Sequence, residues 1–475
     1  MERQGAGEHL VFSSWPVSLY FHVKEGRFMI PMVKRSSIII MCLLYFIASF
    51  SQSTFIYSVL SIVILLTFFL SIVHANKKTM IMGSVLFVAG TVINLTVNQG
   101  TVMATIEGMQ QNLPLVVLMT LAPLLAIPIT NSSLMGSIQQ ILKQMMDSPN
   151  KLFAGLASFL AAITPVLSVG SVKLLHDIVR ENKFSSAFLA RAYFVGFSTA
   201  MVWSPYFGSV ALTLYYLNIP FGDYILIGLV LAFLQLGVGM LLFLSSKDKE
   251  TQKLSSPSAK MSVFPLVSKV IILLGSLIGM LVVLESITGL PMLLLVSLTS
   301  IIIPILWSLG TNSWRVFFYE GKAFFNKLDY GVNTEIVLFL SAGLFGSALA
   351  ASPFSVYISN AFQALSSISF LLVGVIVVLF VSLMAFVGIH QIITVPLLAM
   401  QVSPEALGAD PISLAVVFLL AWFLSSILSP FNAITIFISQ AVHKDTITVG
   451  FKWNGSYVAV MFVVGMVFVA LLHYG

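Results

Sequence analysis

Long apolar runs and short polar connections alternate along most of the chain. An apolar run of about 17 to 25 residues matches a hydrocarbon core about 30 Å thick, so each such run predicts one membrane-spanning helix. The pattern predicts about eleven crossings. They lie near residues 36–52, 54–73, 79–97, 113–130, 187–217, 221–245, 264–286, 291–309, 335–351, 411–440 and 453–473.

Two further apolar stretches, residues 152–176 and 368–400, are interrupted at their centres by polar or helix-breaking residues. The interruptions fall at Thr164–Ser171 in the first stretch and at Gly388–Gln391 in the second. Unpaired backbone is tolerated in a membrane only where protein or water surrounds it. Each stretch therefore predicts a re-entrant hairpin that returns to the side from which it entered.

Proline breaks two of the crossings at equivalent places. Ser204–Gly208 reads SPYFG and Ser429–Ala433 reads SPFNA, 225 residues further along. A proline removes one helical N–H and clashes with the carbonyl four residues back, here that of Met201 or Ser426. A single Ser-Pro is usually a kink, but a pair in two halves of a chain is typical of transporters built from repeats. The pair predicts a polar ligand site.

Composition and charge exclude several classes. With 58% hydrophobic and 8% charged residues, the chain is not a soluble globule, in which about 25% of residues are charged. The single cysteine, Cys42, excludes an intramolecular disulfide and a cysteine-rich metal site. The formal charge is +6, but the basic residues are spread between the apolar runs, so we predict no nucleic-acid binding.

The basic residues also predict the orientation. With the N-terminus in the cytoplasm and both hairpins returning to their own side, all 23 Lys and Arg fall on the cytoplasmic side, as the positive-inside rule requires. The first hairpin then enters from the cytoplasm and the second from outside. We expect a multi-pass protein of the cell (cytoplasmic) membrane with its C-terminus outside.

The order of elements predicts an all-α polytopic membrane protein built from two repeats, each with a re-entrant hairpin and a broken helix. Each unit has five crossings, an odd number, so the second unit is inverted relative to the first. The predicted segments are a cytoplasmic tail (1–35), an extra transmembrane helix (36–53), inverted repeat 1 (54–245), a cytoplasmic linker (246–263) and inverted repeat 2 (264–475).

The hairpin tips and helix breaks hold the candidate substrate- and ion-binding residues. Unwound backbone offers carbonyl oxygens to a cation, and the N-terminus of the following half-helix directs its positive dipole end at an anion. Glycines there permit tight backbone and close approach, and we expect Ser204 and Ser429 to be equivalent. The candidates are Thr164, Ser168, Gly170, Ser171, Ser204, Pro205, Gly208, Ser209, Gly388, His390, Gln391, Ser429, Pro430 and Asn432.

His390 has two interpretations that the sequence leaves open. A histidine at a hairpin tip inside the membrane could carry a coupling proton or donate to an anionic substrate. It could equally be a neutral imidazole that bonds a backbone carbonyl. Gln391, the next residue, is a plausible ligand in either case.

From residue 36 onward, this pattern of one extra crossing followed by two inverted units resembles the ion transporter superfamily. That superfamily includes divalent anion/sodium symporters, citrate carriers and the membrane subunits of arsenite pumps. The resemblance implies that hairpin tips and helix breaks meet at the membrane midplane and bind substrate and cation. The implied site segments are Thr164–Ser171, Trp203–Ser209, Gly388–Gln391 and Ser429–Asn432.

The favoured function is secondary active transport of a small anionic solute by alternating access, coupled to sodium or protons. We expect no enzyme activity and no cofactor besides the coupling ion, with the lipid bilayer and the small anion as partners and a homodimer left open. A glycosyl polymerase or ligase would need external basic residues for its lipid pyrophosphate substrate. A channel would need a polar pore or a ring of subunits.

Overall fold

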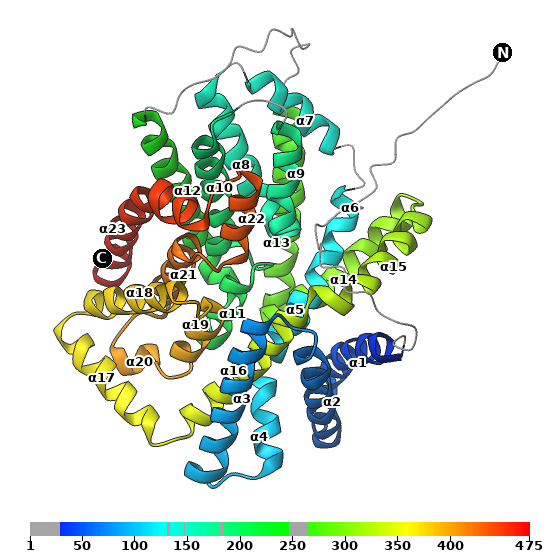
Figure 1. Cartoon of the computed structure of the whole chain (residues 1–475), viewed down its shortest axis with the longest axis vertical. Helices are drawn as coiled ribbons and strands as arrows, with labels where there is room; N and C mark the ends of the chain where they lie inside the picture. The colour runs from blue at the N-terminus through cyan, green and yellow to red at the C-terminus, as the bar shows by residue number, and fades with distance from the viewer. Residues whose placement is uncertain (1–28, 131–133, 147, 181–183, 247–263) are drawn as a thin grey trace.

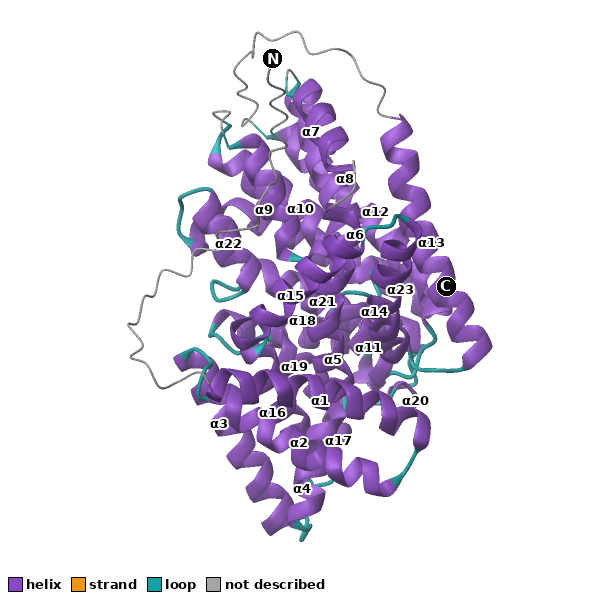
Figure 2. Cartoon of the chain, turned by 90° about the vertical axis from the view of Figure 1, so that its right-hand side faces the viewer, coloured by secondary structure: helices purple, strands orange, loops and turns teal. Residues whose placement is uncertain are grey.

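The computed structural model describes residues 29–130, 134–146, 148–180, 184–246 and 264–475, and within these it contains helices and loops and no strand (Figures 1 and 2). Most of the predicted tail (1–35) and nearly all of the predicted linker (246–263) lie outside the described residues. Eleven helices of the described part are long and apolar enough to cross a membrane. The predicted class, an all-α polytopic membrane protein, is confirmed.

The helices follow one another in nearly the same series in the two halves of the chain. The first half comprises α1 (Met29–Ser51), α2 (Thr54–Ile72), α3 (Lys77–Val92) with a π-helical end, η1 (Ile93–Val97), α4 (Val102–Gly108), η2 (Met109–Asn112), α5 (Leu113–Leu121), η3 (Ala122–Leu125), α6 (Ala126–Thr130), α7 (Leu134–Met145), α8 (Pro149–Leu167), α9 (Val169–Val179), α10 (Ser186–Trp203), α11 (Gly208–Tyr216) and α12 (Phe221–Ser245). The second half comprises α13 (Phe264–Thr288), α14 (Met292–Gly310), α15 (Trp314–Gly331), α16 (Asn333–Ala350), α17 (Phe354–Ile368), α18 (Phe370–Phe386), α19 (Gln391–Ala399), α20 (Pro404–Leu407), α21 (Pro411–Leu428), α22 (Ala433–Ala441), η4 (Thr448–Lys452) and α23 (Trp453–Tyr474).

The eleven long apolar helices are not the same eleven that the sequence predicts. α8 qualifies by length and composition, although the sequence assigns it to a hairpin. The predicted crossing at residues 187–217, divided into α10 and α11, does not qualify, although the equally broken Pro411–Ala441 does. α18, the first arm of the other hairpin, is a shorter apolar helix. Length and hydropathy alone therefore do not distinguish a hairpin arm from a crossing.

Packing partners repeat between the halves. α10 packs against α8 and α12, and α21 packs in the same way against α18 and α23. The half-helices exchange partners, since α11 contacts α19 and α22 contacts α9. Each hairpin thus lies against the broken helix of its own half through one arm and against the half-helix of the other half through the second arm.

The broken helix of the second half is buried in the interior, whereas α13 lies at one edge of the molecule (Figure 2). In the most apolar window of Pro411–Ala441, 89% of residues are buried, against 11% in that of Ser268–Thr288. The outward faces of peripheral helices are themselves apolar, with Phe233 on α12 and Ile272 on α13 largely exposed. A surface of that kind fits lipid rather than water.

One element that the sequence does not predict is α15, an amphipathic helix where only a cluster of basic residues was recognised. It is tied to the start of α1. Arg35 forms an ion pair with Asp329, and Lys34 Nζ donates to the Asp329 carbonyl and, at 3.2 Å, to Asn333 Oδ1. The extra first helix is thereby fixed to the second half of the chain.

Candidate functional site

The first hairpin consists of α8 and α9, joined at Ser168. This residue has φ +48° and ψ −135°, a conformation that glycine adopts far more readily than serine. The hydroxyl groups near the tip bond to one another and to the turn. Thr164 Oγ1 and Ser171 Oγ share a hydrogen bond of 2.9 Å, and Ser171 Oγ donates to the Ser168 carbonyl at 2.6 Å. The side chain of Ser168 itself is exposed.

Gly170 does not provide the unusual backbone conformation of this turn. A Cβ atom built on Gly170 would meet nothing within 4 Å, and its φ is not positive. The turn needs its unusual backbone conformation two residues earlier, at Ser168. No other described part of the chain packs closely against Gly170, which lies at the first turn of α9.

Break 1, residues 204–207, separates α10 from α11. Ser204 Oγ accepts a hydrogen bond from the Tyr206 N–H at 3.2 Å, which supports the turn. The Met201 carbonyl, which loses its helical donor to Pro205, accepts instead from Ser209 Oγ at 2.5 Å. The second half-helix therefore bonds the carbonyl that the proline leaves unpaired in the first.

Break 2, residues 429–432, handles its proline in the same way. The Ser426 carbonyl, four residues before Pro430, accepts from Thr435 Oγ1 at 2.9 Å. Asn432 Oδ1 accepts from the Ile434 N–H at 3.1 Å and caps the start of α22. In both halves the freed carbonyl already accepts a hydrogen bond from a hydroxyl, which leaves each oxygen one lone pair for a ligand.

Hairpin 2 consists of α18 and α19 and is bonded directly to break 2. Ser429 Oγ donates to the Ala385 carbonyl at the end of α18, at 2.6 Å. Gln391 Nε2, at the start of α19, donates to Ser426 Oγ at 2.6 Å. Hydrogen bonds from both arms thus hold this tip against the broken helix.

The turn of hairpin 2 contains a glycine in a backbone conformation that residues with a side chain rarely adopt. Gly388 has φ +103°, and a Cβ atom there would lie 3.4 Å from the ring of Phe431. His390 follows as the N-cap of α19, and its Nδ1 accepts the Ile392 N–H at 3.1 Å. The ring is thus oriented by a backbone N–H rather than by a carbonyl. Its Nε2 has no hydrogen-bond partner among the described residues.

Gly208 opens α11 beside α5. A Cβ atom on it would lie 2.3 Å from Met119 Cε, so this glycine does permit close packing of the half-helix, against the end of a flexible side chain. Pro205 is buried within break 1, whereas Pro430 in break 2 is partly exposed.

Three buried side-chain oxygens on α19 and α11 have no hydrogen-bond partner among the described residues: Gln391 Oε1, Thr394 Oγ1 and Thr213 Oγ1. Gln391 and Thr394 lie three residues apart on α19, and therefore on one face of it. Thr213 lies on α11, the half-helix that packs against α19. Unpaired buried oxygens are costly and call for a water, an ion or a ligand. Sequence reasoning missed both threonines, although each is a polar residue in a short, otherwise apolar half-helix.

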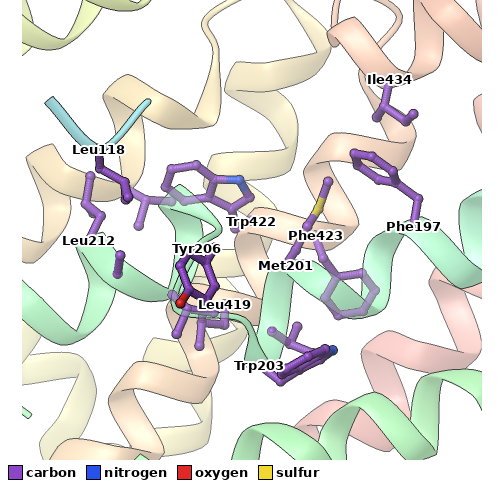
Figure 3. Close-up of a cluster of buried hydrophobic side chains, with 14 of the residues drawn as sticks. Leu118, Phe197, Met201, Trp203, Tyr206, Leu212, Leu419, Trp422, Phe423 and Ile434 are labelled. Atoms are coloured by element: carbon purple, nitrogen blue, oxygen red, sulfur yellow. The ribbon is translucent and has the colours of Figure 1, made fainter. Parts of the chain in front are cut away.

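Apolar side chains fill the space where the two broken helices cross (Figure 3). Trp203 and Tyr206 from the end of α10 and break 1 lie near Leu419, Trp422 and Phe423 of α21. α10 and α21 are in direct contact. The structure therefore brings the two breaks into one region, separated by an apolar cluster, with a hairpin tip bonded to break 2.

The sequence matches no protein-family model and no curated protein. Among solved structures, the fold is similar to that of the YdaH transporter of Alcanivorax borkumensis, whose structure is described as having an unusual topology. The TM-score is 0.54 at 13% sequence identity, over 78% of this chain and 88% of that chain. At this identity the similarity establishes a common fold and leaves substrate and mechanism open.

Proposed function

We propose that this protein is a secondary active transporter that moves a small anionic solute across the cell membrane by alternating access. One observation carries the proposal: two proline-broken helices cross in the interior, and each half-helix contacts the hairpin of the opposite half. This arrangement places two sets of interrupted backbone in one region of an otherwise apolar bundle. The similarity in fold to a transporter structure supports the same function.

The anion is proposed from the half-helices. The N-termini of α11 and α22 both begin at the breaks, and each directs the positive end of its dipole into that region. Gly208 at the start of α11 carries no side chain to cover the backbone N–H groups. A carboxylate or an inorganic oxyanion is the ligand class that such N–H groups favour.

Sodium is the coupling ion that the oxygen atoms favour. Gln391 Oε1 and Thr394 Oγ1 are buried, unpaired and on one face of α19, and hard cations prefer oxygen ligands of this kind. Proton coupling through His390 is the second candidate. Because Nδ1 accepts the Ile392 N–H, the neutral ring carries its proton on Nε2, so uptake of a coupling proton would require Nδ1 to release the cap of α19.

Membership of the ion transporter superfamily, the inverted orientation of the second repeat and the segment boundaries 54–245 and 264–475 belong to the same proposal. So do a cytoplasmic N-terminus and an external C-terminus. The duplicated series of hairpin, broken helix and closing helix supports them. Neither a glycosyl polymerase nor a channel accounts for that duplication, and homodimer formation is a separate question for the purified protein.

Uptake into proteoliposomes tests the proposal. Radiolabelled succinate, citrate, phosphate and sulfate would be offered with a sodium gradient or a proton gradient imposed separately, and protein-free liposomes would serve as the control. We expect accumulation of at least one anion that depends on the sodium gradient. Accumulation driven by the proton gradient alone would favour proton coupling, with His390 as the candidate group, over sodium coupling. Absence of gradient-dependent uptake of all four would contradict the proposal.

A further inference from the structure

A lysine from the first half of the chain lies on the second half-site, which consists of the tip of hairpin 2 and break 2. The Lys78 ammonium is 3.7 Å from the centroid of the Phe431 ring. Lys78 belongs to the first turn of α3, whereas Phe431 is the third residue of break 2. The Phe431 ring also lies against Gly388 at the tip of hairpin 2. The Lys78 ammonium thus lies close to both break 2 and the tip of hairpin 2.

The second half-site provides no formal charge of its own. Residues 370–399, which form hairpin 2, contain no Asp, Glu, Lys or Arg, and neither do residues 411–443, which include α21, break 2 and α22. His390 accepts a backbone N–H through Nδ1 and is therefore placed as a neutral ring. These two segments therefore contribute no formal charge near the tip, and Lys78 places a positive charge on it from α3.

We propose, on the basis of the proposed transport function, that Lys78 is the residue that selects an anionic substrate at the second half-site. In the absence of substrate, the Phe431 ring holds the ammonium beside the tip. A contact between a cation and an aromatic face is weak where water has access, and Phe431 is 42% exposed. An ammonium is a compact charge with three donors, so an incoming carboxylate or oxyanion can take it from the ring at little cost.

The alternative is that Lys78 merely anchors the cytoplasmic end of α3, as basic residues at the ends of membrane helices commonly do. The adjacent Lys77 distinguishes the two roles. Both lysines are exposed in the same helical turn and would anchor it equally well. Only Lys78 lies over the Phe431 ring. Lys77 is therefore a matched control within the same chain.

The first experiment measures the charge at the tip without any substrate. In a Cys42→Ala background, Val387→Cys places a thiol beside Gly388 at a position that is 60% exposed. Its rates of reaction with an anionic and a cationic methanethiosulfonate reagent are compared. Lys78→Met should lower the anion-to-cation rate ratio about five-fold, as expected for one charge at roughly 8 Å in water. Lys77→Met should lower the ratio by a smaller factor, because that lysine does not lie over the Phe431 ring. An equal ratio in Lys78→Met and its parent would overturn the proposal.

The second experiment measures uptake of the anion that the wild-type protein accumulates from among succinate, citrate, phosphate and sulfate. Lys78→Met should raise KM about ten-fold or more, and Lys78→Arg should recover most of that loss because it keeps the charge. Lys77→Met should match the wild type, and thermal melting should report all three variants as folded. An unchanged KM in Lys78→Met, with wild-type uptake intact, would overturn this proposal alone. No uptake of any anion by the wild type would instead overturn the proposed function, and this proposal with it.

Discussion

Each half-site consists of a hairpin tip and the break of the same half. The two half-sites pair the carbonyl freed by proline in the same way, but their hairpin tips are bonded differently. At each break a hydroxyl from the second half-helix bonds the carbonyl that proline leaves unpaired, Ser209 in the first half and Thr435 in the second. Hairpin 2 is bonded to its break through Ser429 and Gln391. In the described part of the chain, the hydroxyls at the tip of hairpin 1 bond only within that hairpin.

This difference indicates that the tip of hairpin 2 and break 2 behave as one unit. Hairpin 1 is joined to its broken helix away from the tip, where His176 Nδ1 and Tyr193 OH lie 3.2 Å apart. The turns of the two hairpins also differ. Hairpin 2 places a glycine where the backbone requires one, at Gly388, and hairpin 1 places a serine there, at Ser168. Equivalent substitutions in the two halves should therefore have unequal effects, which makes the comparison testable.

The largest difference is expected at the turn glycines. Gly388→Ala forces a side chain into φ +103° and against the Phe431 ring, so it should destabilise the fold by about 1–3 kcal/mol. Gly170→Ala meets open space within α9 and should be neutral or stabilising, by up to about 1 kcal/mol. Thermal melting in lipid nanodiscs would compare the two variants. Equal shifts in melting temperature would contradict the conclusion that Gly388, and not Gly170, has a backbone conformation that requires glycine.

Removal of the hydroxyls that bond the freed carbonyls should have the next largest effect. Ser209→Ala and Thr435→Val each leave one buried carbonyl without a donor, at a cost of about 1–3 kcal/mol. The two losses should be similar, because the carbonyls of Met201 and Ser426 are in equivalent positions.

A double-mutant cycle tests the mechanism behind that loss. Pro205→Ala restores a backbone N–H that can bond the Met201 carbonyl. Ser209→Ala should then cost less in the Pro205→Ala background than in the wild type, and melting temperatures of the four proteins give the coupling. Additive effects would show that Ser209 does not replace the donor removed by Pro205.

Substitution of the two serines that precede the prolines should produce a smaller difference in stability. Ser204 Oγ accepts one backbone N–H, whereas Ser429 Oγ accepts one and also donates to the Ala385 carbonyl. Ser429→Ala should therefore cost about 0.5–1.5 kcal/mol more than Ser204→Ala, the contribution of one additional hydrogen bond. It should also raise the labelling rate of a cysteine at Val387, because the tip of hairpin 2 is released. Equal losses would return the two serines to the equivalence that the sequence suggests.

The fold could be predicted from the sequence where a single local cause determines the structure. Apolar run lengths predict most of the crossings, and Pro205 and Pro430 predict the breaks because proline cannot continue a helical hydrogen-bond ladder. The short helix α4 and the amphipathic helix α15 were missed, since neither has the continuous apolar run that identifies a crossing. α8 shows the opposite error, a false indication of a crossing, because a hairpin arm can be as long and apolar as a crossing.

Much less of the site could be predicted, because its arrangement depends on contacts between distant segments. Polar residues at the breaks were found, but the sequence could not show that the hydroxyl of Ser209 bonds Met201. Lys78 was classed as an orientation signal, since no local pattern connects α3 to Phe431. Ser168 and Gly170 were both candidates, with Gly170 expected to permit tight backbone, and only the turn itself shows that Ser168 has the positive φ.

Ser168→Gly is the smallest effect expected and the most direct test of that last point. The native φ of +48° with ψ −135° costs a serine about 1 kcal/mol or more. Glycine removes this strain but loses about 0.4–1 kcal/mol through the added freedom of the unfolded chain. The net stabilisation should therefore be small, about 0.5 kcal/mol, and visible as a slightly higher melting temperature. Ser168→Ala is the matched control, because it removes the exposed hydroxyl and keeps the strain, so its melting temperature should equal that of the wild type. A decrease for Ser168→Gly as large as that expected for Gly388→Ala would show that the serine side chain itself stabilises the tip, in addition to the hydrogen bonds of Thr164 and Ser171.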